Sequence, residues 1–475
     1  MSVGGTLTQI GTDSEPLRVA IVGSGPAGFY AAEHLLKRGD LAVQVDMFDR
    51  LPTPFGLVRF GVAPDHQKIK KVIRVYDKVA SDERFQFFGN VDIGDDIELA
   101  ELKQHYHQIC FATGAQTDRR LGIPGEDLGR SHPATEFVAW YNGHPEYSDY
   151  HFDLSVERVA VVGVGNVAVD VARILCRTPE ELAKTDIADY ALEALSQSRV
   201  REVFVVGRRG AAQAAFTNAE IRELGEMEGA DLVVLPEEVE LDPLSQADVD
   251  GSQDKALVRK VDILQQLATA DVTGKEKRLT LRFLVSPVEI RGDDDGNVSG
   301  MRLVKNELYR SDDGSLRPRS SDSFEDLPVD MVFRSVGYRG VAIPDLPFNE
   351  SWGVVPNEKG RVLEHEGGEP LAGLYVAGWI KRGPSGVIGT NKPDAVETVG
   401  LMLEDVAAER TLRPENTDRT VLSQFVSERQ PNHFSYGDWK RLDQLETGRG
   451  EPDGRPRVKF TSVAEMLANL ERDPS

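Results

Sequence analysis

Short apolar runs and glycine-rich turns alternate along the first part of the chain. The apolar run Leu17–Val22 ends in the turn Gly23–Gly28, and a segment with helical periodicity and a second apolar run, Val43–Phe48, follow. Nearly continuous apolar runs of this length are typical of strands buried inside a parallel sheet. The order of strand, glycine turn, helix and strand therefore predicts a βαβ unit.

The same pattern occurs a second time. Arg158–Val162 is the apolar run, Gly163–Ala168 is the turn, Val169–Cys176 continues with helical periodicity, and Glu202–Val206 is the next apolar run. Two such units in one chain predict an α/β fold with two Rossmann-like dinucleotide-binding domains. The chain then has two dinucleotide sites, or one site and one relic.

Each glycine of the first turn has a mechanical role in a dinucleotide site. Gly23 makes the tight turn, Gly25 lets the backbone approach a pyrophosphate, and Gly28 lets the helix pack against the strand. The phosphate then lies at a helix N-terminus, where backbone N–H groups are free. Asp49 ends the second apolar run and is the candidate to bind a ribose, while Asp46 inside the run is the competing acid. The alternative is a glycine-rich turn in another kind of α/β protein.

The second turn has the form GxGxxA, with Ala168 in the place of the third glycine. Arg208 and Arg209 follow its second apolar run, and no acid stands there. A ribose that carries a 2′-phosphate repels a carboxylate and attracts guanidinium groups, which bind phosphate through two hydrogen bonds. This pattern favours NADP over NAD, and the alternative is a solvated basic loop.

Composition narrows the class of protein. The 55 Lys and Arg against 78 Asp and Glu give a net charge of −23, which excludes a uniformly basic surface and argues against a nucleic-acid partner. No stretch approaches the ~18 apolar residues of a membrane span. Cys110 and Cys176 stand far apart, which excludes a disulfide framework, a CxxC redox pair and a cysteine-based zinc site. We expect a cytoplasmic protein with a disordered tail at 1–16 that is neither a secretory signal nor a transit peptide.

Several longer blocks carry a family resemblance. They are Leu51–Arg59, Gly61–His66, Gly165–Leu175, Gly207–Leu224 and Ala377–Ala395. Together they resemble the adrenodoxin reductase family of NADPH:ferredoxin reductases, in its bacterial branch, from about Leu17 to about Leu470. The resemblance implies electron transfer from NADPH through FAD to a ferredoxin, a small acidic iron–sulfur protein.

The resemblance also implies the division of the chain and the residues of both sites. The FAD-binding domain would comprise 17–116 and 333–475, and the NADP-binding domain 117–332 would be inserted between its two parts. In the second domain, 236–258 and 292–327 are expected to be turn-rich surface excursions. For FAD, the matching residues are Gly23, Gly25, Pro26, Ala27, Asp49, Leu57, Val91, Trp379, Gly386, Val387 and Ile388. For NADP, they are Arg119, Val164, Gly165, Asn166, Val167, Arg208, Arg209 and Glu220. Asp49 departs from the family, which more often has Glu there.

The residues at the flavin also have an interpretation without the family. Thr390 or Asn391 is expected to cap a helix, with Pro393 in its first turn. Glycines at 383, 386 and 389 allow close approach of the backbone just before that helix. A helix N-terminus aimed at the flavin would stabilise negative charge there.

His66 and Glu223 are the candidate catalytic pair. His66 precedes a predicted helix over Gln67–Ala80, so it is either a helix-start residue or a proton-handling residue beside flavin and nicotinamide. Glu223 lies three residues after Glu220, and the matching carboxylate of the family pairs with the histidine. Glu220 also completes a capping box that starts at Thr217, which is a purely structural role.

A cluster of basic residues contrasts with the net charge of the chain. The predicted helix over Gln67–Ala80 has a core face formed by Ile69, Val72, Ile73, Tyr76 and Val79, and it carries Lys68, Lys70, Lys71, Arg74 and Lys78. Two anionic proteins need a local positive patch to meet, so this helix is a candidate docking surface for a ferredoxin. Lys381 and Arg382 compete for that role, and a solvated helix face is the plain alternative.

Three other functions share the two motifs. A flavin-dependent monooxygenase would form a hydroxylated product, and a nucleotide sensor would bind NADP without reducing an acceptor. An electron-input subunit of a larger complex usually carries cysteine-ligated clusters, which two isolated cysteines cannot supply.

Overall fold

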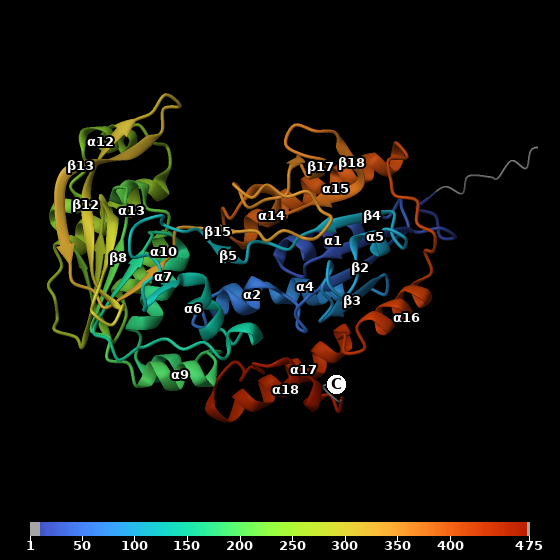
Figure 1. Cartoon of the computed structure of the whole chain (residues 1–475), viewed down its shortest axis with the longest axis horizontal. Coiled ribbons are helices and arrows are strands. Elements are labelled where there is room, and N and C mark those ends of the chain that lie inside the picture. Colours follow the sequence, from blue (N-terminus) through green and yellow to red (C-terminus); the bar gives the residue numbers. More distant parts are fainter. Residues whose placement is uncertain (1–9, 473–475) are drawn as a thin grey trace, which may run out of the picture.

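The structure is a computed structural model that describes residues 10–472. Two sheets lie in two lobes along the long axis of the molecule (Figure 1). The first lobe contains a seven-stranded sheet in the order β16-β17-β18-β4-β1-β2-β3. Its strands are β1 (Leu17–Val22), β2 (Val43–Asp49), β3 (Phe85–Gly89), β4 (Gln108–Phe111), β16 (Asn357–Glu358), β17 (Arg361–Leu363) and β18 (Pro370–Val376).

The pairs from β18 to β3 are parallel, and β16 and β17 extend the sheet by antiparallel pairing. The C-terminal part of the chain thus completes a sheet that the N-terminal part begins. The helices of this lobe are α1 (Pro26–Leu36), α2 (Leu57–Phe60), α3 (Gln67–Lys70), α4 (Ile73–Ala80), α5 (Leu99–Leu102), α14 (Trp379–Arg382), α15 (Asn391–Ala407), α16 (Arg419–Arg429), α17 (Tyr436–Gly450) and α18 (Val463–Asn469), with 3₁₀ turns η3 (Ile388–Thr390) and η4 (Glu451–Asp453).

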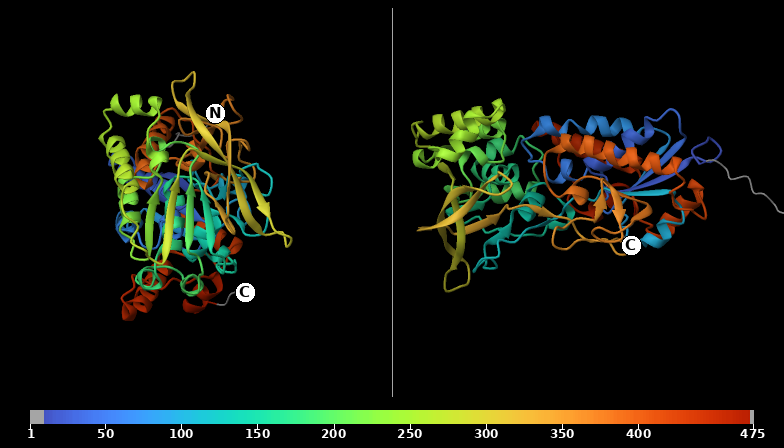
Figure 2. Two further views of the ribbon diagram at one scale, coloured as in Figure 1. Left: turned by 90° about the vertical axis from the view of Figure 1, so that its left-hand side faces the viewer. Right: turned by 90° about the horizontal axis from the view of Figure 1, so that it is seen from above.

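The second lobe contains a six-stranded parallel sheet in the order β6-β14-β7-β8-β10-β9, seen in Figure 2. Its strands are β6 (Ser131–Pro133), β7 (Arg158–Val162), β8 (Glu202–Val206), β9 (Ala230–Val234), β10 (Lys277–Arg282) and β14 (Met331–Arg334). Its helices are α6 (Ala134–Tyr141), α7 (Asn166–Cys176), α8 (Pro179–Leu182), α9 (Asp189–Ser196), α10 (Asn218–Gly225), α11 (Pro236–Val239), α12 (Pro243–Asp250) and α13 (Lys255–Ala268), with 3₁₀ turns η1 (Pro145–Tyr147) and η2 (Ala211–Gln213).

A short ribbon links the lobes. Its strands β5 (Thr117–Asp118) and β15 (Tyr338–Arg339) pair antiparallel, so the chain leaves and re-enters the first lobe side by side. We propose that the two domain crossings lie at this ribbon. The second crossing then follows β14, which ends at Arg334.

Both expected βαβ units are confirmed. The predicted strands Leu17–Val22, Arg158–Val162 and Glu202–Val206 are β1, β7 and β8 with the predicted bounds. Their side chains form the buried cores, since β1 is buried at every position. These strands can be predicted from their apolar runs alone, because a strand that is buried on both faces has few polar positions.

One prediction about the rest of the chain is wrong, and two others are only partly correct. The helix over 67–80 is broken at residues 71–72 into α3 and α4, and Ile69 of its supposed core face is 45% exposed. The segments 236–258 and 292–327 are mostly exposed, as expected, but they form regular elements. Residues 236–258 contain α11, α12 and the start of α13, and 292–327 form most of a three-stranded antiparallel sheet of β11 (Val285–Gly292), β12 (Val298–Arg310) and β13 (Leu316–Leu327).

The disordered tail expected at 1–16 can be compared with the structure only from residue 10 onward. Residues 1–9 lie outside the described part of the chain. Gly11 and Thr12 donate backbone hydrogen bonds to the Glu15 carbonyl, and the Ala42 N–H donates to Gly11 at 2.8 Å. Residues 10–16 therefore form a turn attached to the start of β2, and not a disordered segment.

Candidate dinucleotide and redox site

The first glycine turn has the geometry of a phosphate cradle. Gly23 has a φ of +107°, and a Cβ there would lie 2.5 Å from the Ala112 carbonyl oxygen. A Cβ on Gly28 would lie 2.1 Å from the Gly23 carbonyl oxygen, so α1 packs this close to the turn only with glycine. Gly25 has open space over its Cα, and Pro26 begins α1 behind it. The turn fits a pyrophosphate lying on the helix N-terminus.

Asp49 stabilises this turn through hydrogen bonds. Its carboxylate accepts hydrogen bonds from the Ser24 N–H at 2.8 Å, from the Ser24 hydroxyl at 2.5 Å and from the Leu51 N–H at 2.9 Å. Burial raises the pKa of Asp49 against these opposing hydrogen bonds. The competing acid, Asp46, is fully buried and pairs with Arg18 and Arg419, so its role is structural.

The loop after β2 closes over the first turn. A Cβ on Gly56 would lie 3.1 Å from the Gly25 Cα, so Gly56 approaches the backbone of the first turn at close range. Phe55, just before it, adopts a positive φ of 86°, which is unusual for a side chain of that size. Leu57 starts α2, and Val91 is buried with its N–H donating to the Asp49 carbonyl. Val91, which follows β3, is thus in direct backbone contact with Asp49.

The second turn repeats the cradle on β7 and α7. A Cβ on Gly163, whose φ is +136°, would lie 2.1 Å from the Ser335 carbonyl oxygen. Gly165 again has open space, and Asn166 begins α7. The Asn166 Oδ1 atom is buried without a hydrogen-bond partner, which leaves an acceptor at the helix start. Val164 and Val167 lie within the turn, are partly buried and pack against the core of this lobe.

Arg208 and Arg209 follow β8 without any ion-pair partner among residues 10–472. The Asn306 amide donates to the Arg208 carbonyl at 2.8 Å, and the Leu284 N–H donates to the Arg209 carbonyl at 3.1 Å. The backbone is thus held while the guanidinium groups stay free. Burial, and then the charge of Arg208, lowers the pKa of Arg209. Two cations that repel each other here favour an anionic ligand.

Two further residues expected at the NADP site have different surroundings. Arg119 is exposed on the linking ribbon, where its N–H donates to the Gly337 carbonyl at 2.9 Å. Glu220 forms the capping box of α10, with its carboxylate accepting from the Thr217 N–H at 2.7 Å. Burial raises the pKa of Glu220. The capping role is therefore observed, and any contact to a ribose would use the remaining carboxylate oxygen.

His66 joins the two lobes. It stands at the N-cap of α3 in the first lobe, and its Nε2 lies 2.9 Å from the Glu223 Oε2 on α10 of the second. Its Nδ1 lies 3.8 Å from the Asp170 Oδ1 on α7. The structure therefore brings together His66 and Glu223, which are 157 residues apart in sequence.

Sequence reasoning missed the charges that hold this junction. The Arg173 guanidinium donates to Asp65 at 2.6 Å and to Asp170 at 2.7 Å. Burial opposes ionisation of Asp65, but Arg173 and Arg177 hold its pKa well below the usual range. Burial raises the pKa of Asp170 even beside Arg173. Asp65 directly precedes His66 in the chain, and this position is the sequence signal that could have indicated its place at the junction.

The segment expected beside a flavin lies at the end of β18. Trp379 opens α14, its Nε1 donates to the Ser385 carbonyl at 3.1 Å, and its ring lies 5.6 Å from that of Tyr338. Gly386 has a φ of +81°, and the side chain of Val387 is 50% exposed. Ile388 begins η3. The exposed Val387 side chain is an apolar group that a flat ring system could cover.

The expected cap of the next helix differs from the prediction. Thr390 is the N-cap of α15, but its hydroxyl donates to the Val387 carbonyl at 2.7 Å and caps no helix N–H. Asn391 begins the helix, with its amide hydrogen atoms directed to the carbonyls of Val387 and Ile388. No side chain caps the N–H groups at the start of α15, and Pro393 stands in the first turn as predicted.

The predicted basic helix face contains fewer exposed cations than expected. Lys70 is only 7% exposed, and its ammonium group donates to both oxygens of Asp186 at 2.7 and 2.8 Å. The competing Lys381 is also buried and pairs with Glu397 at 2.7 Å. The four exposed members are Lys68, Lys71, Arg74 and Lys78, and none has an ion-pair partner within the described residues.

Two searches of residues 10–472 bear on other classes of site. No helix there has the length and apolar character that a membrane span requires. In the same range, no group of three or more His, Cys, Asp and Glu side chains is arranged to hold a metal ion. Cys110 and Cys176 are both free and buried, and burial raises the pKa of each thiol to about 12.

Two glycine cradles on two separate sheets, with a hydrogen-bonded histidine and glutamate that join the two lobes, are typical of an oxidoreductase that binds two dinucleotides. Comparison with known proteins agrees. A family model described as pyridine nucleotide-disulphide oxidoreductase matches residues 17–224. The chain is 45% identical over 454 residues to the NADPH-ferredoxin reductase FprA of Mycobacterium leprae, which covers 94% of this chain and 97% of that protein.

A plant relative extends the comparison. The chain is 42% identical over 465 residues to the mitochondrial NADPH:adrenodoxin oxidoreductase of Arabidopsis thaliana, covering 96% of this chain and 95% of that protein. The solved structure of Mycobacterium tuberculosis FprA in complex with NADPH has a TM-score of 0.89 at 44% identity and covers 96% of this chain and all of that one. The chain belongs to the family of NADPH:ferredoxin and NADPH:adrenodoxin reductases.

Proposed function

We propose that this chain is a ferredoxin–NADP⁺ reductase that takes a hydride from NADPH and delivers single electrons to a ferredoxin. One observation carries the proposal: two phosphate cradles stand on separate sheets, and only the second has paired, unpartnered arginines beside it. The first cradle fits a dinucleotide without a 2′-phosphate, and the second cradle fits a dinucleotide that carries one. FAD and NADP(H) are the corresponding cofactors.

The first cradle fits FAD. Gly25 and Ala27 offer backbone N–H groups at the start of α1, Gly23 makes the turn, and Pro26 begins the helix without an N–H group of its own. Asp49 fixes the turn through Ser24. Trp379 and Gly386–Ile388 provide the surface for the flavin ring. When bound, FAD supplies the chemistry that converts a two-electron donor into single-electron steps. The uncapped N–H groups at the start of α15 would stabilise negative charge nearby.

The second cradle fits NADP(H). The residues that would hold it are Val164, Gly165, Asn166 and Val167 at the pyrophosphate, and Arg208 and Arg209 at the 2′-phosphate, with Arg119 and Glu220 at the edge. The free Oδ1 atom of Asn166 is an acceptor, so it suits a hydroxyl group of a ribose, and the pyrophosphate would meet backbone N–H groups at the start of α7. The arginines discriminate against NADH because a ribose without the phosphate leaves two cations without a partner.

His66 and Glu223 would act where the two cofactors meet. The Glu223 carboxylate accepts from one ring nitrogen when that nitrogen carries a proton, and Asp170 faces the other nitrogen. These contacts orient the imidazole and position its proton at the junction of the lobes. We assign His66 and Glu223 as catalytic residues on this geometry.

The electron acceptor is a small acidic iron–sulfur protein. The exposed cations Lys68, Lys71, Arg74 and Lys78 form a local positive surface on a chain of net charge −23, which suits an anionic partner. We place the reaction in the cytoplasm, because two free, buried cysteines suit a reducing compartment.

The test is the steady-state reduction of a purified bacterial ferredoxin by the FAD-loaded chain, with NADPH and NADH compared at equal concentration. We expect NADPH-dependent reduction that is much faster than with NADH. Substrate-stimulated NADPH oxidation with a hydroxylated product would indicate a monooxygenase instead. NADP binding without reduction of either a ferredoxin or an acceptor dye would indicate a nucleotide sensor.

A further inference from the structure

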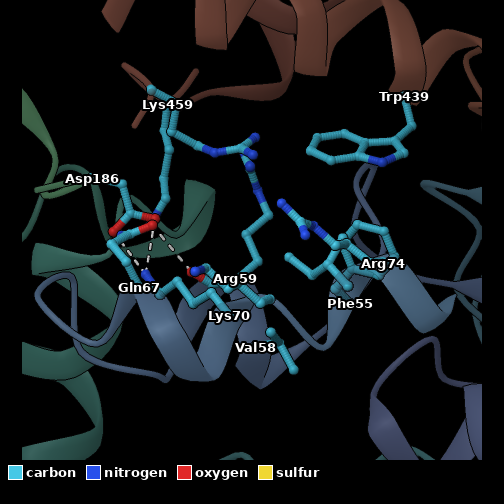
Figure 3. Close-up of a pocket in the computed structure, with 12 residues that line it drawn as sticks. Phe55, Val58, Arg59, Gln67, Lys70, Arg74, Asp186, Trp439 and Lys459 are labelled. Atoms are coloured by element: carbon cyan, nitrogen blue, oxygen red, sulfur yellow. Dashed lines mark hydrogen bonds and ion pairs between the residues drawn. The ribbon is translucent and has the colours of Figure 1, made fainter. Parts of the chain in front are cut away.

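A cavity of about 220 Å³ lies beside the loop of Phe55 (Figure 3). Three distant parts of the chain line it: residues 55–74 of the first lobe, Asp186 after α8, and the C-terminal segment from Trp439 to Lys459. No residue of the glycine turns lines it, and neither do Arg208, Arg209 or Trp379. It is therefore distinct from the proposed dinucleotide sites.

The lining has a surplus of positive charge. Six cations surround the cavity: Arg59, Lys70, Lys71, Arg74, Arg457 and Lys459. The carboxylates that pair with them are shared. Asp186 accepts from Lys70 and also lies 3.4 Å from the Lys459 ammonium group, as Figure 3 shows. Glu446 accepts from Arg59 at 2.8 Å and from Arg457 at 3.1 Å, and Arg457 has a further partner in Asp443.

Lys71 and Arg74 leave this charge uncompensated. Both are exposed at the cavity wall, and neither has an ion-pair partner in the part of the chain that the structure describes. Lys70 and Lys459 are buried, and burial lowers the pKa of both ammonium groups despite Asp186. Cations that crowd around too few carboxylates are stabilised by a bound counter-ion.

The apolar wall strengthens the attraction for an anion. Phe55, Val58, Ile73 and Trp439 line the same cavity and exclude water from part of it. The Arg59 guanidinium lies 5.0 Å from the centroid of the Trp439 ring, and the Arg457 guanidinium lies 6.0 Å from the same centroid. Fixed guanidinium groups match the oxygens of a tetrahedral oxyanion, and a low local dielectric raises each interaction.

We propose that this cavity is a binding site for a small multivalent oxyanion of the phosphate class, either inorganic phosphate or the phosphate group of a small metabolite. The bound anion would connect the first lobe, the Asp186 segment and the C-terminal segment, which otherwise meet through shared carboxylates. Because the wall includes Phe55 next to Gly56, the site lies beside the loop that closes over the first cradle.

The test is isothermal titration calorimetry of the FAD-loaded protein with sodium phosphate. Saturating NADP⁺ occupies the other phosphate-binding region, and chloride keeps the ionic strength constant. We expect saturable binding of one phosphate per chain. A parallel titration with glycerol phosphate distinguishes the source: tighter binding of the ester indicates a metabolite, and tighter binding of phosphate indicates the free ion.

Matched variants locate the binding. Lys71→Gln with Arg74→Gln removes two cations of the cavity wall and is expected to weaken binding by about tenfold or more. Lys68→Gln with Lys78→Gln removes two exposed cations outside it and is expected to change the affinity by less than about twofold. All four side chains are exposed, so FAD content and circular dichroism should match the wild type. No saturable binding of either phosphate, or equal losses in both variants, would overturn the proposal.

Discussion

The double substitution Arg208→Ala with Arg209→Ala isolates the choice of coenzyme from the rest of the chemistry. Neither guanidinium group has an ion-pair partner in the described chain, while the backbone carbonyls of both residues are held by Asn306 and Leu284. Removing the side chains therefore leaves the loop in place and takes away only the two guanidinium groups.

The magnitude follows from the hydrogen bonds that are lost. A hydrogen bond between charged partners contributes about 1.5–3 kcal/mol, and Arg208 is exposed, so the lower part of that range applies to it. Two such contacts then stabilise bound NADPH by about 3–4 kcal/mol, which corresponds to a loss of roughly 10²–10³ in kcat/KM for NADPH. NADH has no 2′-phosphate, so its kcat/KM should change by less than about threefold.

The assay is the initial rate of acceptor-dye reduction over a range of NADPH and NADH concentrations. Arg199→Ala with Arg413→Ala is the control, because it removes two exposed arginines that also lack ion-pair partners in the described chain. We expect the control to behave as wild type with both coenzymes. Equal losses with NADPH and NADH in the Arg208/Arg209 variant would refute the 2′-phosphate assignment.

The remaining predictions concern the junction of the lobes and the buried charges. His66→Ala should slow hydride transfer from NADPH in a stopped-flow trace, with Glu223→Gln having a smaller effect because Asp170 still faces the ring; an unchanged rate would assign His66 a helix-start role alone. Reversing the charge of Lys68 and Lys78 should flatten the salt dependence of ferredoxin reduction while leaving reduction of a neutral dye intact; an unaltered salt profile would exclude this face as the docking surface. Asp186→Asn should cost about 3–5 kcal/mol of unfolding free energy at pH 7, because Lys70 and Lys459 lose their shared partner. Burial opposes ionisation of Asp186, but Lys459 and Lys70 hold its pKa at about 2, so its contribution is present above about pH 4 and is lost as the pH falls toward 2; a difference in melting temperature between wild type and variant that stays constant from pH 7 to pH 3 would contradict this.

The parts of the fold that the sequence predicts are those determined locally. Leu17–Val22 and its glycine turn carry their signal within a dozen residues, because the buried strand and the steric demand on Gly23 and Gly28 are short-range properties. The paired arginines after β8 are equally local. His66 and Glu223 needed the family resemblance to be paired, since they come from different lobes.

The burial of charged side chains could not be predicted in this way. Lys70 has the spacing of a surface lysine, and it is buried because Asp186 and Lys459, from remote segments, surround its ammonium group. The break between α3 and α4 exposes Ile69, which regular periodicity places in the core. Thr390 has a capping sequence, but its hydroxyl finds the Val387 carbonyl instead. In each case a tertiary contact outweighs a local preference.

The central claim is that one chain holds two different dinucleotides, one resident and one exchanging. The most direct measurement is the absorbance spectrum of the purified protein, recorded anaerobically before and after one equivalent of NADPH. We predict a flavin spectrum corresponding to one FAD per chain, which bleaches with NADPH and recovers when oxidised ferredoxin is added. A colourless protein that does not take up added FAD would contradict the account.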